Sequence, residues 1–449
     1  MSAIFRDSAA AASEKYDLII VGGGIYGVML ALEAGKRRQR ALLLEQEDFG
    51  GATSLNHLRT VHGGLRYLQS FDLPRCLESI QERRWFLANF PALVQVLPCL
   101  MPLYGRGLKR PFIMAPALVL NDLLGFNRNR GVGAQKRLPP ESLLLHHGQV
   151  RGVLARDQQS GQHHEFRSPL VINAAGPWCR QLAQKFDRDY PRLFRKNLLL
   201  FNILFKRRAL SEYALALNPP SPTGRRAQPP SRRDHTYFVH NWKNRLLAGT
   251  AEILVADQAE NPRPEPEQIA EFIYDMNSAV PELILSEKDV EQVYSGILPA
   301  TEAGTLAKHE VIIRHQDHGG PSGLFSVSGV KFTTSRLVAE KTMRRVFPGR
   351  PVREPQGPPA DANSGRWVFA YDWLPGADTA NAAFASLKTL AEEEAVVHLD
   401  DLIFRRSSLG ENRRRVSELL PRLRPLFAWN DLRWQQESER LKKLAQPWF

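Results

Sequence analysis

The distribution of apolar residues along the chain predicts alternating strands and helices. The first apolar run, residues 18–21, ends at three consecutive glycines, and a helix-forming run, residues 28–34, follows. A second apolar run, residues 41–44, ends at the acidic residue Glu45. A short continuous apolar run is typical of a strand that is buried on both faces. The beginning of the chain is therefore predicted to be a parallel β–α–β unit.

Later segments repeat both patterns. Apolar and charged residues recur at helical spacing in residues 75–95, 265–279 and 336–346. Short apolar or alternating runs predict strands at 150–157, 165–168, 170–173, 196–205, 236–250, 290–296 and 324–328. Lys243 and Asn244 separate two β-rich runs within 236–250, which predicts a hairpin. The chain is therefore assigned to the α/β class, with a second, mostly antiparallel sheet after residue 195.

Segments rich in proline mark the expected boundaries. The clearest is a Pro/Gly-rich linker at 348–365, after which the chain is helical and basic to residue 449. Residues 218–234 are expected to be a surface insertion, and residues 97–137 a connecting segment. Residues 1–14 lack the apolar centre of a signal peptide and are expected to be a frayed leader.

Composition narrows the class of protein. The chain has 449 residues, enough for two or three domains, and contains no run of 18 apolar residues. Its cysteines, Cys76, Cys99 and Cys179, are not closely spaced, which suggests neither a disulfide framework nor a metal site. A reducing cytoplasm is the expected setting. The net charge of +13 points to an anionic substrate, an anionic membrane surface or nucleic acid. Nucleic acid is the least favoured, because zinc-finger spacing and RNA-binding aromatic signatures are missing from the sequence.

The glycines after the first strand suggest the first chemistry. Gly22, Gly24 and Gly27 have the spacing G-x-G-x-x-G of dinucleotide-binding turns. In such turns the first glycine makes the turn, the second lets the backbone approach a pyrophosphate, and the third lets helix and strand pack closely. Glu45, at the end of the second strand, is placed to bind both hydroxyls of an adenosine ribose. These residues predict a nucleotide cofactor and leave NAD and FAD both open.

Three more motifs carry a resemblance to a known family. They are the small-residue loop Ala52-Thr53-Ser54, the string His62-Gly63-Gly64-Leu65-Arg66-Tyr67-Leu68, and the strand–glycine–helix segment 324–334. Together with the glycine turn and Glu45, they resemble the FAD-dependent glycerol-3-phosphate dehydrogenases of the D-amino-acid oxidase superfamily. The resemblance favours FAD over NAD.

The resemblance implies a fold and an activity. It implies a Rossmann-type FAD-binding domain with an inserted antiparallel β substrate domain and a C-terminal helical domain. The expected divisions are 1–195 (with the connecting segment 97–137), 196–295, 296–347, the linker 348–365, and 366–449. Hydride would pass from a secondary alcohol to FAD, and electrons to quinone. The protein would be cytoplasmic, with a possible peripheral contact to the inner face of the membrane through its basic surface.

The resemblance also implies the residues that contact FAD. They are Gly22, Gly24, Gly27, Glu45, Gln46, Thr53, Ser54, Gly63, Gly64, Leu65, Ala174, Gly176, Gly296, Gly329, Lys331, Phe332 and Thr333. No metal ligand is expected.

Four residues are candidates for substrate chemistry. Arg66 is expected to hold a substrate phosphate or carboxylate near the flavin, the alternative being a surface salt bridge. Lys331 is expected to stabilise negative charge on the reduced flavin or to bind the substrate anion, the alternative being a solvated lysine. His240 is the candidate base, although a core histidine is the more common case. Lys308 lies where the family tends to place a phosphate-binding arginine. Whether Lys308 binds phosphate or has no such role stays open.

The chain departs from the family in three places. Ile297 stands where the family has an arginine implicated in substrate handling, and Val330 stands where it has a glycine. The family also carries several dozen more residues in the region 137–150. Ile297 weakens glycerol 3-phosphate as the substrate, because an apolar side chain cannot hold a phosphate. The alternatives are an oxidoreductase of the same superfamily that acts on an amine, an amino acid or a 2-hydroxy acid, and a degenerate, non-catalytic flavoprotein.

Overall fold

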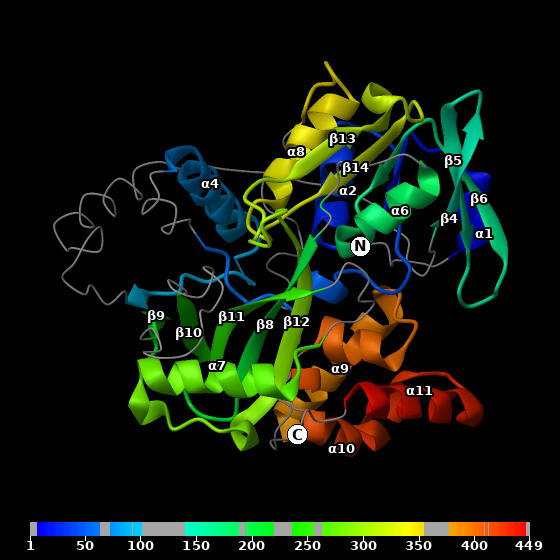
Figure 1. Cartoon of the computed structure of the whole chain (residues 1–449). Helices are drawn as coiled ribbons and strands as arrows, with labels where there is room; N and C mark the ends of the chain where they lie inside the picture. The colour runs from blue at the N-terminus through cyan, green and yellow to red at the C-terminus, as the bar shows by residue number, and fades with distance from the viewer. Residues whose placement is uncertain are drawn as a thin grey trace.

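The computed structural model describes residues 7–62, 72–91, 93–100, 140–187, 194, 196–219, 236–255, 263–353, 377–407, 409–411 and 413–445. Figure 1 shows a first sheet with its helices, a second sheet beneath it, and a group of C-terminal helices beside the second sheet. The α/β class predicted from the sequence is confirmed.

The first sheet is the predicted parallel one. Its strand order is β13-β14-β7-β1-β2, and only the edge strand β13 runs antiparallel to its neighbour. The strands are β1 (Leu18–Val21), β2 (Ala41–Leu44), β7 (Val171–Asn173), β13 (Val311–Arg314) and β14 (Leu324–Ser328). Every residue of β1 is buried, as expected for a strand that is covered on both faces.

Alternate residues of β1 face two different layers. Leu18 and Ile20 pack against α2 (Ile25–Lys36), α4 (Leu73–Asn89) and α8 (Ser335–Val346). Ile19 and Val21 pack against a three-stranded sheet on the other face. That sheet has the order β4-β5-β6, with β4 (Pro140–His146), β5 (Gln149–Arg156) and β6 (His163–Arg167), and α6 (Cys179–Phe186) lies beside it.

The second sheet is mostly antiparallel, as predicted. Its order is β12-β8-β11-β10-β9-β3. The strands are β3 (Cys99–Leu100), β8 (Lys196–Phe205), β9 (Ala214–Leu217), β10 (Tyr237–Trp242), β11 (Arg245–Val255) and β12 (Val290–Ala300). Lys243 and Asn244 make the predicted hairpin turn with φ of 53° and 64°, the conformation of a type I′ turn. Strand β12 extends to Ala300, so it crosses the division predicted between residues 295 and 296.

Helix α7 (Pro266–Ala279) covers one face of this sheet. A capping box between Glu265 and Gln268, with Pro266 in the first turn, fixes where the helix begins. Its apolar stripe, Ile269, Phe272, Ile273 and Met276, is buried against the sheet. The helical spacing read from residues 265–279 is therefore confirmed.

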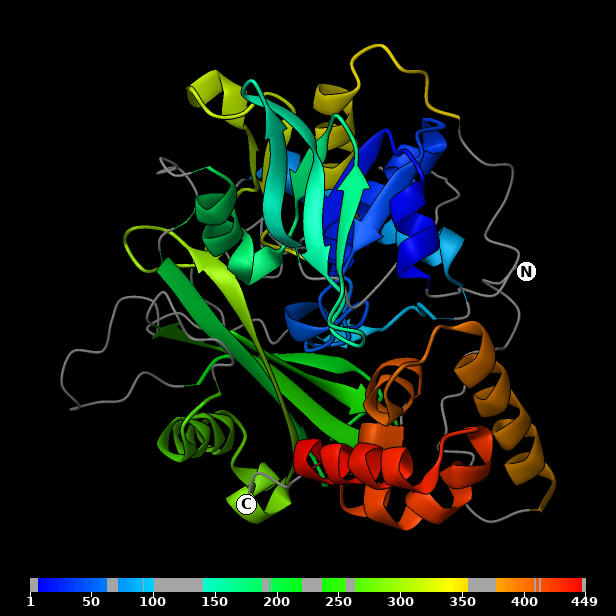
Figure 2. The same ribbon diagram turned by 90° about the vertical axis from the view of Figure 1, so that its right-hand side faces the viewer.

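The C-terminal region is helical in its described part, and it has its own core. It contains α9 (Ala377–Glu393), the π-helix η9 (Asp401–Arg406), α10 (Arg413–Leu423) and α11 (Asp431–Leu444). Figure 2 shows these orange and red helices beside the green second sheet and below the first sheet. Trp242 Nε1 of β10 donates to Glu411 Oε1 of this region at 3.0 Å.

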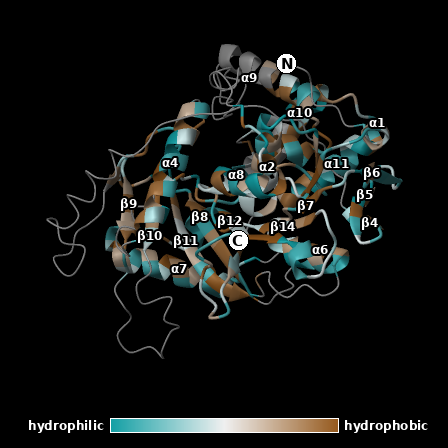
Figure 3. Ribbon diagram, turned by 90° about the horizontal axis from the view of Figure 1, so that it is seen from above, coloured by the Kyte–Doolittle hydropathy of each residue, from teal (hydrophilic) through white to brown (hydrophobic). Residues whose placement is uncertain are grey.

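Hydropathy follows these layers. Figure 3 shows hydrophobic colour along the internal strand β14, whereas α4 and α7 carry hydrophobic and hydrophilic faces. Among the described helices, none combines the length and apolarity needed to cross a bilayer. Cys76, Cys99 and Cys179 are free thiols.

The expectation of a frayed leader was wrong for residues 8–13. These residues form helix α1 (Ser8–Ser13), and the Asp7 side chain caps it by accepting from Ala10 N at 2.8 Å. Ser8 Oγ also donates to Asp157 Oδ2 at 3.0 Å, which ties the helix to the end of β5. The run of alanines has the highest helix propensity, and the cap satisfies one of its free N–H groups.

Candidate cofactor and substrate site

The glycine turn between β1 and α2 has no room for side chains. Gly22 has φ of +104°, and a Cβ there would lie 2.6 Å from the carbonyl oxygen of Ala174. A Cβ on Gly27 would lie 1.8 Å from the carbonyl oxygen of Gly22. The first glycine therefore makes the turn and the third lets α2 pack on it, as the spacing predicts.

Two side chains accept the N–H groups of this turn. Glu45 Oε2 accepts from Gly23 N at 2.6 Å, and Ser54 Oγ accepts from Ile25 N, in the first turn of α2, at 2.9 Å. Burial raises the pKa of Glu45, and the N–H groups of Glu47 and Gly23 oppose that rise. A carboxylate and a hydroxyl thus lie at the positive end of a helix, where anions bind well.

These groups fit the adenosine ribose and the pyrophosphate of an adenine dinucleotide. Gly24 is the N-cap of α2, and a Cβ there would meet Ser54 Oγ at the tight distance of 3.2 Å, so this position favours a glycine. The N–H groups at the start of α2 suit a pyrophosphate, and Glu45 suits a ribose diol. The chemistry of this donor set is consistent with FAD. Gln46, the residue after Glu45, is also predicted to contact FAD, and its side chain is exposed.

The small-residue loop joins the first sheet to the second. Thr53 Oγ1 donates to the carbonyl oxygen of Ile297 at 2.9 Å and lies 3.1 Å from its amide nitrogen. A Cβ on Gly296 would lie 2.9 Å from Thr53 Cα, so the loop requires a glycine at that point of β12. Ser54 and Thr53 are adjacent, so one short loop contacts both the helix α2 and the second sheet.

The strand–glycine–helix segment 324–334 contacts the same helix through Tyr26. The Tyr26 hydroxyl donates to the carbonyl oxygen of Lys331 at 2.7 Å and lies 3.1 Å from its amide nitrogen. The ring fills the space beside Gly329, where a Cβ would lie 1.7 Å from Tyr26 Cζ. Burial raises the pKa of Tyr26, so its hydroxyl stays protonated. This bond fixes residues 329–331 to the first turn of α2.

Lys331 lies in a mixed electrostatic environment. Burial, and secondly the positive charge of Arg75, lower the pKa of Lys331 to about 8, while Glu78, Asp72 and Glu310 oppose the shift. A lysine that titrates near neutral pH at a predicted cofactor edge is typical of a functional position. Phe332 and Thr333 follow it, and Thr333 is buried. Val330 is buried too, at 4% exposure.

The sequence analysis missed His57 and Arg59. His57 stacks on Phe332, with 4.5 Å between the ring centroids, and burial lowers its pKa to about 3, so the imidazole is neutral. The guanidinium of Arg59 lies over the rings of Tyr294 and Trp242, at 5.0 Å and 5.9 Å from their centroids. Arg59 has φ of 55°, and its buried Nε has no hydrogen-bond partner. Neither a positive φ nor a contact with a distant sheet leaves a local signal in the sequence.

His240 lies at the same junction. It is 4% exposed, and both of its ring nitrogens lie 3.1 Å from carbonyl oxygens, Nδ1 from Asn241 and Nε2 from Leu58. This arrangement ties β10 to the loop that carries Thr53 and Ser54. The role of His240 as a base stays a prediction.

The remaining predicted residues are scattered. Ala174 N donates to the carbonyl oxygen of Val21 at 2.8 Å, beside the glycine turn. Gly176 has φ of +54° and lines a small pocket with Pro177, Pro299 and Ser328. Lys308 is exposed. Gly63, Gly64, Leu65 and Arg66 lie outside the described residues.

The sequence matches one protein-family model and several curated glycerol-3-phosphate dehydrogenases. The model of the family described as FAD dependent oxidoreductase matches residues 17–107 and 108–345. The glycerol-3-phosphate dehydrogenase of Synechocystis sp. is 26% identical over 396 residues, which cover 74% of this chain and 70% of the relative. The aerobic glycerol-3-phosphate dehydrogenase of Bacillus subtilis is 25% identical over 377 residues, 73% of this chain. The chain spans 66% of that relative, just under two thirds.

A solved structure shares the fold over nearly the whole chain. The glycerol-3-phosphate dehydrogenase from Bacillus halodurans, crystallised with FAD, matches with a TM-score of 0.72 at 21% identity. The match covers 98% of this chain and 97% of that structure. At 21% identity, this match shows that the two chains share a fold.

Proposed function

Because this chain belongs to the FAD dependent oxidoreductase family, we propose that it is a dehydrogenase that oxidises a small anionic secondary alcohol resembling glycerol 3-phosphate. FAD is its cofactor, in agreement with the sequence prediction. The observation that carries the proposal is the meeting of three segments at one place. The loop with Thr53 and Ser54 contacts both α2 and β12, and Tyr26 ties the flavin-side segment at Lys331 to the same helix.

Each segment has a role in this proposal. When bound, FAD supplies the hydride acceptor of such an oxidation. Gly22, Gly24 and Gly27, with Glu45 and Ser54, would hold its adenosine and pyrophosphate parts. Ala174 and Gly176 would border that half, and Gly296, Gly329, Phe332 and Thr333 the flavin half. By sequence motif, Gly63, Gly64 and Leu65 belong to the same set.

Cations near the junction would bind the substrate anion. Lys331 and, by sequence motif, Arg66 are the predicted groups, and the geometry adds Arg59, whose guanidinium faces the aromatic rings of the substrate sheet. Lys308 is a weaker candidate because it is exposed. An orienting contact from a fixed cation lowers the entropy cost of reaching a reactive geometry.

Ile297 supports a second candidate substrate class. Its side chain is 6% exposed, and its backbone is bonded to Thr53. A buried apolar side chain cannot bind phosphate, so one contact expected for a phosphate ester is missing. A small amine, amino acid or 2-hydroxy acid, which carries at most a carboxylate, is the alternative that this residue favours.

We propose quinone as the electron acceptor and a peripheral membrane contact through the basic surface. The net charge of +13 supports attraction to anionic lipid. Protein that stays in the supernatant with anionic vesicles at low ionic strength would contradict the contact.

The proposed function is tested by anaerobic bleaching of the bound flavin. We expect glycerol 3-phosphate, added without oxygen to the yellow holoenzyme, to abolish the visible absorbance band of the oxidised flavin, because hydride transfer reduces FAD. A soluble quinone should then restore the band. Amines, amino acids and 2-hydroxy acids form the comparison panel. If one of them bleaches the flavin and glycerol 3-phosphate does not, the second candidate replaces the first.

The pH profile tests Lys331. The lowered pKa of Lys331, about 8, means that its positive charge is lost as pH rises through that value. If the charge binds the substrate anion, kcat/KM should be constant below pH 8 and fall by about tenfold per pH unit above it. Lys331→Arg keeps the charge to higher pH and should remove this decline. An identical decline in both enzymes would assign the ionisation to another group.

A further inference from the structure

A buried ionic cluster joins the C-terminal helices to the segment that follows β2. Arg406 of η9 donates to both carboxylate oxygens of Asp48, from Nη1 to Oδ2 and from Nη2 to Oδ1, the latter at 2.9 Å. Asp48 is 0% exposed and Arg406 is 8% exposed. A bidentate guanidinium–carboxylate pair of this kind is specific in geometry as well as in charge. It connects residues that are 358 positions apart.

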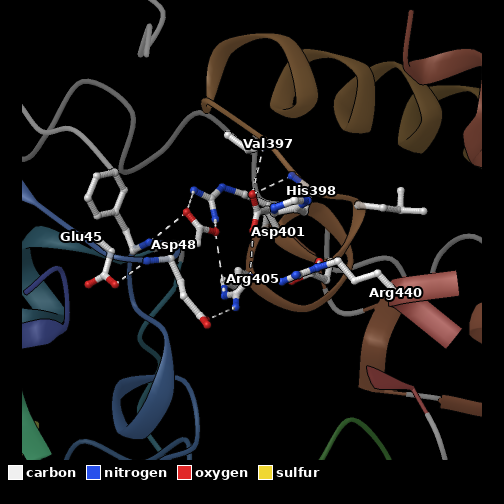
Figure 4. Close-up of polar contacts among 12 residues, drawn as sticks. Glu45, Asp48, Val397, His398, Asp401, Arg405 and Arg440 are labelled. Atoms are coloured by element: carbon white, nitrogen blue, oxygen red, sulfur yellow. Dashed lines mark hydrogen bonds and ion pairs between the residues drawn. The ribbon is translucent and has the colours of Figure 1, made fainter. Parts of the chain in front are cut away.

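The neighbouring charges complete the cluster. Figure 4 shows Arg405 between Asp48 and Asp401, with Arg440 on the far side. Arg405 Nη1 donates to Asp401 Oδ1 at 2.9 Å, and Arg405 Nε lies 3.9 Å from Asp48 Oδ2. Arg440 Nε donates to Asp400 Oδ1 at 2.7 Å. Arg405 and Arg406 therefore contact the segment after β2, whereas Arg440 donates to Asp400, within the C-terminal region.

Asp48 lies in the same short segment as Glu45. Glu45 Oε1 accepts from Glu47 N at 2.9 Å, and Glu45 Oε2 accepts from Gly23 N at 2.6 Å. Gly50 N donates back to the carbonyl oxygen of Gly23 at 2.9 Å. The segment 45–50 is thus held against the glycine turn at both of its ends. Asp48 lies between these contacts, and Arg406 of the C-terminal region binds the segment there.

We propose that Arg406 is a positioning residue for FAD, which acts through Asp48 to hold Glu45 at the dinucleotide turn. The C-terminal helical region thereby becomes part of the cofactor site without touching the cofactor. The inference rests on the role proposed above for Glu45 as the ligand of the adenosine ribose.

The physical reason is the cost of an unpaired buried charge. When the C-terminal region is docked, Arg406 and Arg405 neutralise Asp48. If the Arg406 guanidinium is removed, Asp48 loses its bidentate partner and keeps Arg405 Nε at the longer distance of 3.9 Å. A buried carboxylate that is paired so weakly is unfavourable, so Asp48 moves toward water. The segment 45–50 must then move, and it carries Glu45 with it. Docking of the C-terminal region and binding of FAD are consequently linked, so each should favour the other.

The test is the dissociation constant of FAD, measured by titrating the full-length apoprotein and following flavin fluorescence. We expect Arg406→Met to weaken FAD binding by tenfold or more. The matched control is Arg440→Met, which breaks an ion pair of the same cluster but leaves the contact with Asp48 intact, and it should change the constant by less than threefold. In the double variant Asp48→Asn/Arg406→Gln, no buried charge is left unpaired, so this protein should bind FAD within about threefold of the wild type, and it can be measured even if Arg406→Met does not fold.

A double-mutant cycle with Glu45→Gln separates positioning from general stability. If Arg406 acts through Glu45, the effects of Arg406→Met and Glu45→Gln on FAD affinity should be less than additive, because each removes the same contact. Additive effects, equal effects of Arg406→Met and Arg440→Met, or FAD binding that is tenfold weaker in the Asp48→Asn/Arg406→Gln protein would each overturn the proposal. If Glu45→Gln alone leaves the affinity unchanged, the role of Glu45 fails first and this inference fails with it. Bleaching of the wild-type holoenzyme by substrate tests the proposed function separately from this inference.

Discussion

Gly27→Ala is expected to abolish stable retention of FAD and to lower the free energy of unfolding by about 3 kcal/mol. The added Cβ would lie 1.8 Å from the carbonyl oxygen of Gly22 and 3.3 Å from Leu43 Cδ1. An unstrained contact requires roughly 3.5 Å, so α2 must move away from the turn. That movement takes with it the N–H of Ile25 and the hydroxyl of Tyr26, which contact Ser54 and Lys331.

Val28→Ala is the matched control for this substitution. Val28 is the next residue of α2, and it is 39% exposed. Its truncation should change the free energy of unfolding by less than about 0.5 kcal/mol and leave FAD bound. Urea unfolding followed by tryptophan fluorescence, together with the ratio of flavin to protein absorbance, measures both effects. A yellow Gly27→Ala protein with the stability of the wild type would show that α2 does not depend on this close approach.

Local chemistry explains which parts of the fold could be predicted. The β–α–β unit at residues 18–44 combines apolar runs with glycines, and the hairpin at Lys243-Asn244 combines β-rich runs with a two-residue turn. Both signals lie within a few residues of the structure that they specify. Helix α1 was missed because its cap and its contact with Asp157 stabilise a segment that is too short to signal a helix alone.

The predicted cofactor half of the site has a clearer sequence signal than the predicted substrate half. Gly22, Glu45 and Ser54 act through one backbone turn, so their spacing in the sequence nearly determines their geometry. The substrate half is assembled by contacts such as Thr53 with Ile297, 244 positions apart, and Tyr26 with Lys331, 305 positions apart. The tertiary packing that makes such contacts has no local signature.

The same distinction applies to the predicted catalytic side chains. His240 was chosen from its place in a strand, and it is occupied by two backbone carbonyls that only the fold brings near it. Arg59 is not among the residues predicted from the sequence, although the fold places it against two aromatic rings of the second sheet. The side-chain roles thus depend on how the loop at residues 52–62 docks on the second sheet.

Arg336→Met is expected to lower the free energy of unfolding by about 3–5 kcal/mol, because it leaves a buried carboxylate without its partner. Arg336, on α8, donates through Nε to Glu82 Oε2 at 3.0 Å and through Nη1 to Glu340 Oε2 at 3.0 Å. Glu82, on α4, is 1% exposed. Burial raises the pKa of Glu82, and the charge of Arg336 is the main influence that opposes the rise. The pair therefore holds α4 against α8 on the face of the sheet that also carries α2.

Lys341→Met on the same helix is the matched control. Lys341 Nζ contacts Glu78 and Glu310, each at 3.0 Å, but its side chain is 38% exposed. Solvent screens these pairs, so their loss should cost less than about 1 kcal/mol. In Arg336→Met the loss should shrink as pH falls toward 5, because a protonated Glu82 carries no buried charge, and should grow as pH rises. Arg336→Met/Glu82→Gln should recover part of the stability at neutral pH. Equal losses in Arg336→Met and Lys341→Met, without dependence on pH, would show that the buried charge of Glu82 is not what Arg336 stabilises.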